Sequence, residues 1–105
     1  MAQQRADQSA EAVLRNNLGL VRQGKGEANE AAQLFRQAMA LNQALGNLTS
    51  EASNHVNLGI LAEGRHEYDT AEREFERALE LDKTAEHRTE IAADLLRLGR
   101  VAGRG

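Results

Sequence analysis

The sequence predicts an all-α domain of about two and a half repeated helical pairs. The dipeptide Leu-Gly occurs at residues 18–19, 58–59 and 98–99, at intervals of forty residues. Apolar residues recur at spacings of three and four, which is typical of helices with one buried face. The 105 residues contain no proline, and no segment alternates apolar and polar residues long enough to predict a strand. Such a period is typical of a stacked array, in which each unit buries its apolar face against its neighbours.

The repeat extends well beyond the Leu-Gly pairs. Residues 17–41 and 57–81 share nine identities, at Asn17/Asn57, Leu18/Leu58, Gly19/Gly59, Gly24/Gly64, Glu27/Glu67, Ala31/Ala71, Phe35/Phe75, Ala38/Ala78 and Leu41/Leu81. A glycine inside a helix costs about 1 kcal/mol relative to alanine, so its recurrence at 19, 59 and 99 indicates a close approach by a neighbouring helix. We expect Ala31 and Ala71 to make that approach, with the two phenylalanines filling the space beside it.

Five helices are expected, with ends set by glycines and capping residues. The first spans about 8–24 and the second, after the break at 24–26, about 27–45. The turn at 46–50 supplies a glycine and several N-cap candidates for the third helix, at about 49–64. The fourth spans about 67–82 and the fifth about 85–102, with Thr84 as its expected N-cap. A single domain, 1–105, thus holds unit one at 8–45, unit two at 49–82 and a C-terminal half-unit or capping helix at 85–102.

The pattern of small and aromatic residues resembles the tetratricopeptide repeat (TPR). The residues that carry this resemblance are Leu18, Gly19, Gly26, Ala28, Ala31, Phe35 and Ala38 in the first unit and Leu58, Gly59, His66, Tyr68, Ala71, Phe75 and Ala78 in the second. The resemblance implies a right-handed α-α superhelix. The chain departs from the family in lacking the proline at the end of a unit and in its period of forty residues, where the basic repeat has about 34. The longer period resembles the branch found in kinesin light chains and bacterial regulatory proteins.

Composition limits the classes of partner. The formal net charge of −3 argues against a nucleic-acid or anionic-membrane surface, which needs a clustered basic face. Residues 1–15 lack the apolar core of a signal peptide, and no apolar run approaches the length of a transmembrane helix. The absence of cysteine excludes disulfides and thiolate metal sites. We therefore expect a cytoplasmic protein with no nucleic-acid or membrane partner.

The sequence predicts no enzyme, no cofactor and no metal site. His55, His66 and His87 occupy unrelated positions in the repeat and lack a partner at metal-ligand spacing. His55 lies on the packing face, where we expect it to be buried beside the preceding unit. The glycines around Lys25 follow a helix rather than a strand, so this segment is interpreted as an interhelical turn and not a phosphate-binding loop.

The family resemblance implies a concave surface lined by the first helix of each pair. Stepping by forty residues along these helices places an apolar floor beside a row of amides and arginines, which suits an extended or helical peptide. The predicted groove residues are Asn16, Asn17, Leu20, Val56, Asn57, Ile60, Leu96, Arg97 and Arg100. The predicted function is non-enzymatic binding of a peptide or partner helix in this groove. The alternative is structural self-association, in which the fifth helix mediates homo-oligomerisation of a larger scaffold or regulatory protein.

Overall fold

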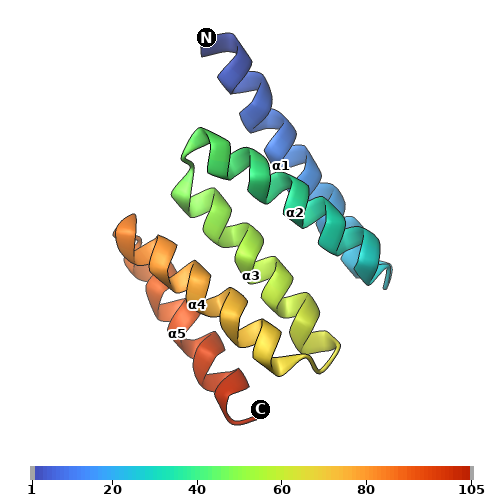
Figure 1. Cartoon of the computed structure of the whole chain (residues 1–105), viewed down its shortest axis with the longest axis vertical. Helices are drawn as coiled ribbons and strands as arrows, with labels where there is room; N and C mark the ends of the chain where they lie inside the picture. Colours follow the sequence, from blue (N-terminus) through green and yellow to red (C-terminus); the bar gives the residue numbers. More distant parts are fainter. Residues whose placement is uncertain (1, 105) are drawn as a thin grey trace.

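The computed structural model describes residues 2–104, and five helices lie in this range. They are α1 (Ala2–Gly24), α2 (Ala28–Leu45), α3 (Leu48–Gly64), α4 (Tyr68–Thr84) and α5 (Arg88–Ala102), joined by short turns (Figure 1). Each helix packs against the next one along the chain, and the all-α prediction is confirmed. Over the described residues, no helix combines the length and the apolar character needed to cross a membrane.

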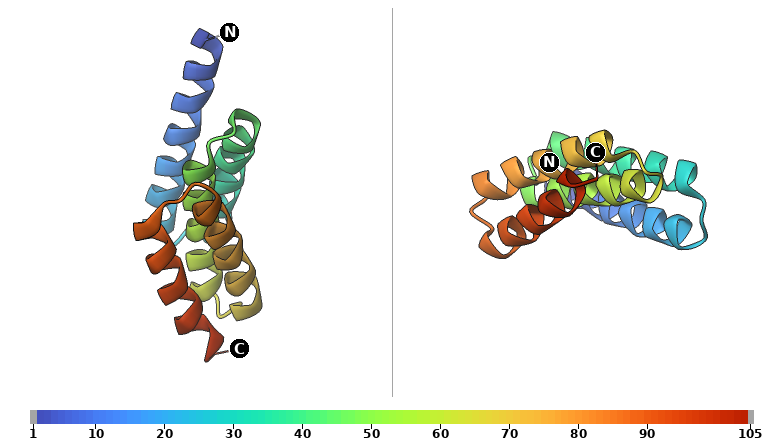
Figure 2. Two further views of the ribbon diagram at one scale, coloured as in Figure 1. Left: turned by 90° about the vertical axis from the view of Figure 1, so that its left-hand side faces the viewer. Right: turned by 90° about the horizontal axis from the view of Figure 1, so that it is seen from below.

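The helices form two layers. In the right-hand view of Figure 2, α1, α3 and α5 lie along one side and α2 and α4 along the other, and the array bends toward the side of α1, α3 and α5. The first helices of the repeated pairs therefore line the inner face, which is where the groove was predicted.

Two helix starts differ from the prediction. The first helix begins at Ala2 and not near residue 8, and the fifth begins at Arg88 and not near residue 85. Thr84 is not the N-cap of α5, because it is the last residue of α4 and its hydroxyl donates to the carbonyl of Glu80, 3.0 Å away. His87 occupies the N-cap position instead. Threonine readily bonds back to the carbonyl four residues earlier, and this bond competes with capping.

The repeated glycines at 19 and 59 make room for phenylalanine rings, whose atoms are the nearest to their Cβ positions. A methyl group placed on Gly59 would lie 2.5 Å from Cε1 of Phe75, and one on Gly19 would lie 2.6 Å from the equivalent atom of Phe35. Both rings are completely buried. The third glycine, Gly99, has nothing within 4 Å of its Cβ position, so it serves no such packing role among the described residues.

The four turns between successive helices share the same backbone geometry. The first or second residue after each of α1 to α4 adopts a positive φ angle: Gly26 (78°), Gly46 (72°), His66 (62°) and Glu86 (57°). The backbone N–H of the next residue then bonds back to a carbonyl five residues earlier, over 2.9–3.0 Å. This arrangement satisfies carbonyls that the helix leaves unpaired, and it favours glycine because a Cβ is strained at positive φ. Two of the four turns therefore carry strain.

Replacing Glu86 with glycine should raise the free energy of unfolding by about 0.5–1 kcal/mol, because glycine adopts this backbone conformation without strain. The matched change is Gly46→Ala at the equivalent position of the first unit, which should lower stability by about 1 kcal/mol. Urea denaturation of both variants measures the two effects. Equal stability of Glu86→Gly and wild type would show that the turn is not strained.

Candidate functional site

Two hollows lie along the inner face, and they are related by the repeat. The first, of about 150 Å³, lies among α1, α3 and the end of α2. The second, of about 210 Å³, lies one unit further on, among α3, the end of α4 and the start of α5. Six of the lining positions correspond across forty residues: Ser9/Thr49, Ala12/Ala52, Val13/Ser53, Asn16/Val56, Asn42/Asp82 and Ser50/Glu90. Of the predicted groove residues, Asn16 lines the first hollow and Val56 the second.

A chain of side-chain amides crosses the first hollow. Nδ2 of Asn42 donates to Oδ1 of Asn54 over 2.8 Å, and Nδ2 of Asn54 donates to Oδ1 of Asn16 over 2.9 Å. The same oxygen of Asn16 accepts a second bond, of 3.0 Å, from Nδ2 of Asn57. Asn42 and Asn54 are buried, whereas Asn16 and Asn57 are half-buried at the surface. The chain joins α2, α3 and α1 and fixes the orientation of Asn57, the central amide of the predicted groove.

The apolar groove residues fall into two groups. The side chains of Leu20, Ile60 and Leu96 are exposed, with 44%, 36% and 76% of their surface accessible. Val56 is buried instead, because it belongs to the core cluster around Phe75. The three exposed side chains are therefore accessible on this face, while Val56 mainly supports the fold.

Both arginines of the predicted groove are paired within the chain. Nη1 of Arg97 donates to Oδ1 of Asp94 over 3.0 Å. Arg100 forms two bonds, of 2.7 and 2.6 Å, with the two carboxylate oxygens of Glu63, and these link α5 to α3. The hydrogen bond with Glu63 also raises the pKa of Arg100. A guest carboxylate at either guanidinium would compete with an existing partner.

Carboxylates replace the buried amides at the second hollow. Asp82 and Asp94 stand forty residues after Asn42 and Asn54, and both are buried. Burial and the neighbouring carboxyl of Asp82 raise the pKa of Asp94 from 3.8 to about 7, although the Arg97 guanidinium acts in the opposite direction. Glu90 lies near them, and one oxygen from each of the three carboxylates lies within 4.8 Å of the others.

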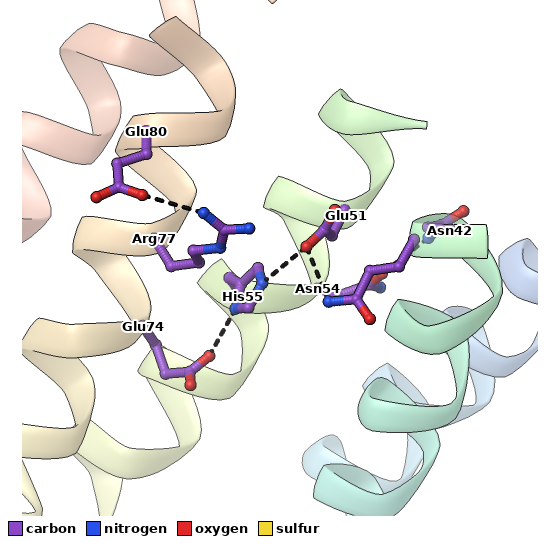
Figure 3. A network of polar contacts seen from close by, with 8 residues as sticks. Asn42, Glu51, Asn54, His55, Glu74, Arg77 and Glu80 are labelled. Carbon is purple, nitrogen blue, oxygen red and sulfur yellow. Dashed lines mark hydrogen bonds and ion pairs between the residues drawn. The ribbon is translucent and has the colours of Figure 1, made fainter. Parts of the chain in front are cut away.

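His55 occupies the middle of a polar network (Figure 3). Its Nδ1 lies 2.9 Å from Oε2 of Glu74 on α4, and its Nε2 lies 3.3 Å from Oε2 of Glu51 on α3. The prediction that His55 is buried is confirmed. Its hydrogen-bond partners are on its own helix and on α4 of its own unit. Gln43 of α2 supplies the link to the preceding unit, because its amide donates to Glu51 over 3.0 Å.

Four polar residues that the structure brings into these sites were not among the predicted ones: Asn42, Asn54, Asp82 and Asp94. The forty-residue register contained a signal for one pair, because Asn42 and Asp82 occupy equivalent positions on helical stripes that are otherwise apolar. A polar residue that recurs at a core position indicates a hydrogen-bonded pair, since burying an unpaired polar group is costly.

Comparison with known proteins agrees with the repeat and with the helical packing. A family model described as tetratricopeptide repeat matches residues 9–84, which include α2, α3, α4 and most of α1. No curated protein gives a match. Repeats of the matched family mediate protein–protein interactions. The match covers more than half of the chain and includes most of α1 and all of α2, α3 and α4, so the chain belongs to the tetratricopeptide repeat family.

Proposed function

We propose that the chain binds an extended peptide or a partner helix along the inner face formed by α1, α3 and α5. The observation that carries this proposal is a row of exposed side chains that repeats from helix to helix. Leu20 and Ile60 occupy the same register on α1 and α3, beside the hydrogen-bonded amides of Asn16 and Asn57. An apolar floor next to oriented amides can accept an apolar side chain and bond to the backbone of a guest.

The amide chain supports this assignment because it holds the site in place before a partner arrives. Asn57 uses one amide proton in its hydrogen bond to Asn16, so its second amide proton and its side-chain oxygen remain available to a guest. A side chain already ordered in the free protein loses less entropy on binding. The net charge of −3 favours a protein over a nucleic acid as the guest.

Asn57→Ala should weaken binding of the partner by about 1–2 kcal/mol, because the guest loses an oriented hydrogen-bonding group. The partner is first recovered by affinity capture with the wild-type chain and identified by mass spectrometry. Its affinity for wild type and variant is then measured by isothermal titration calorimetry. Melting curves of both proteins show whether the fold is retained.

The matched control is Glu76→Lys, an exposed change on α4 in the opposite layer, which should leave affinity within a factor of about two. Ile60→Arg should reduce the affinity for the partner, as Asn57→Ala does, because it places a charge on the apolar floor. A partner that responds to Glu76→Lys and ignores both inner-face variants would place binding on the outer layer and contradict the proposal.

Self-association is the second candidate, and exposed leucines on α5 favour it. Leu95 exposes 53% of its surface and Leu96 even more, whereas Leu98 is half-buried against the core. Exposed apolar residues that adjoin one another mark association surfaces. They support the alternative in which the fifth helix mediates self-association.

We expect light scattering to show dimers whose fraction rises with protein concentration between the micromolar and millimolar ranges. The double variant Leu95→Glu/Leu96→Glu should abolish these dimers. The control is Ala92→Glu, an exposed alanine on the same helix, which adds charge without removing a large apolar side chain. A wild-type chain that stays monomeric throughout this range would exclude this candidate.

A further inference from the structure

The two interfaces between successive repeat units, one at each hollow, carry different polar residues at equivalent buried positions. In the first, the buried amides of Asn42 and Asn54 satisfy each other, because an amide carries both a donor and an acceptor. In the second, Asp82 and Asp94 take these positions. Ionised carboxylates only accept hydrogen bonds, so this pair needs a positively charged or protic partner that the amide pair does not need.

The surrounding residues satisfy only part of that need. Arg97 reaches Oδ1 of Asp94, 3.0 Å away. The other oxygen of Asp94 and Oδ1 of Asp82 are buried and have no hydrogen-bond partner among the described residues. His87 stands at the rim with its Nδ1 3.9 Å from Oδ1 of Asp82, too far for a hydrogen bond. Two buried carboxylate oxygens therefore lack a donor.

Glu90 provides a third carboxylate close to those of Asp82 and Asp94. It lies on α5 one helical turn before Asp94, so the two side chains share a face, and Asp82 approaches from the end of α4. One oxygen of each carboxylate lies within 4.8 Å of the others. Asp82, His87 and Glu90 also line the hollow of about 210 Å³, which provides an entry path and room for water.

We propose that Asp82, Glu90 and Asp94 bind one calcium ion. Calcium takes oxygen ligands at about 2.3–2.6 Å, so oxygens on adjacent or opposite sides of the ion lie about 3.4–5 Å apart, as these three can. Three carboxylates and the Arg97 guanidinium leave two excess negative charges, which a divalent cation cancels and a single shared proton does not. Water in the hollow completes the coordination shell.

This site departs from the expectation of no metal, which considered histidine and cysteine spacing. The ligands come from α4 and α5, which the turn at residues 85–87 brings together. A bound ion would clamp the half-unit to the rest of the array, because its ligands lie on both sides of that turn. The proposal is independent of what the inner face binds.

The test uses the full chain stripped with EDTA and then dialysed into a chelator-free buffer. Calcium chloride is titrated in by calorimetry, and melting curves are recorded with and without the ion. We expect one site per chain with a Kd of about 10⁻⁴–10⁻³ M, the range of modest calcium sites. We also expect a rise in Tm of about 5 °C near saturation. Magnesium should bind more weakly, because it demands shorter bonds and a stricter geometry.

The decisive control is Asp82→Asn/Asp94→Asn, which recreates the amide pair of the first interface and should therefore fold. It should show neither calcium heat nor a calcium-dependent Tm. Glu72→Gln/Glu76→Gln removes the same charge elsewhere on α4 and should keep the wild-type response. Absence of a response in wild type at about 10 mM calcium, or an equal response in the double asparagine variant, would overturn the proposal.

Discussion

Replacing Gly59 with alanine should lower the free energy of unfolding by about 2–3 kcal/mol. The added methyl group would lie 2.5 Å from Cε1 and 2.8 Å from Cδ1 of Phe75. The ring cannot step aside, because Phe75 is completely buried at the centre of its core cluster. The clash outweighs the gain of about 1 kcal/mol that alanine brings to a helix. Urea denaturation followed by circular dichroism measures the loss.

Gly99→Ala is the matched control for this prediction. It makes the same change at the same repeat position, but nothing lies within 4 Å of the new methyl group. The free energy of unfolding of this variant should therefore rise by up to about 1 kcal/mol, because alanine has the higher helix propensity. Combining Gly59→Ala with Phe75→Leu should cost less than the sum of the single changes, since the smaller side chain relieves the clash. Similar losses at Gly59 and Gly99 would show that the ring contact is not the reason for the glycine.

Raising the pH from about 5.5 to 8 in the presence of EDTA should lower Tm by about 5 °C. The cause is Asp94, whose pKa is raised from 3.8 to about 7 by burial and by the adjacent Asp82. Below pH 3.8 this carboxyl is protonated in both states. Between 3.8 and 7 the unfolded chain releases the proton and the folded chain keeps it, so the free energy of unfolding falls as pH rises. Above about 7 the folded protein holds the buried charge, and this stabilisation is lost.

The comparison with Asp82→Asn/Asp94→Asn isolates this effect from the other ionisable groups. The charged residues facing Asp94 are Asp82, Glu90 and Arg97, and His87 lies at the rim. The double variant removes the titrating carboxyl of Asp94 together with its neighbour and leaves the other three groups in place, so its Tm should change much less over the same pH range. Parallel curves for the two proteins would mean that Asp94 does not titrate between these limits.

Much of the fold could be predicted because its determinants are local and periodic. Spacings of three and four located the five helices, and the forty-residue period located the turns. The recurring glycine at 19 and 59 also indicated a close helix contact. The residue that packs against this glycine could not be predicted from the spacing. A glycine can pack against another small residue or against an aromatic ring, and the angle between the helices decides which. Gly99 keeps the motif, yet nothing lies within 4 Å of its Cβ position.

The candidate site was predictable in outline and not in its pairings. The register of the first helices placed Leu20, Ile60 and Asn57 on one face, which agrees with the layer formed by α1, α3 and α5. The pairing of Arg100 with Glu63 spans 37 residues, so no spacing within a single helix reveals it. Val56 could not be distinguished from an exposed floor residue, because its burial depends on how closely α3 packs against its neighbours.

The sequence by itself determined that this protein is an array of helical pairs, that it repeats every forty residues, and which faces of its helices are apolar. These properties follow from residue type and periodicity along one chain. Tertiary structure alone decided that Phe75 fills the space over Gly59, that Asn54 joins three helices, and that Asp82 meets Asp94 where the first unit has two amides. These pairings depend on helices meeting at a fixed distance and angle. Burial, and after it the neighbouring carboxyl of Asp82, raises the pKa of Asp94 only once α4 and α5 are packed together.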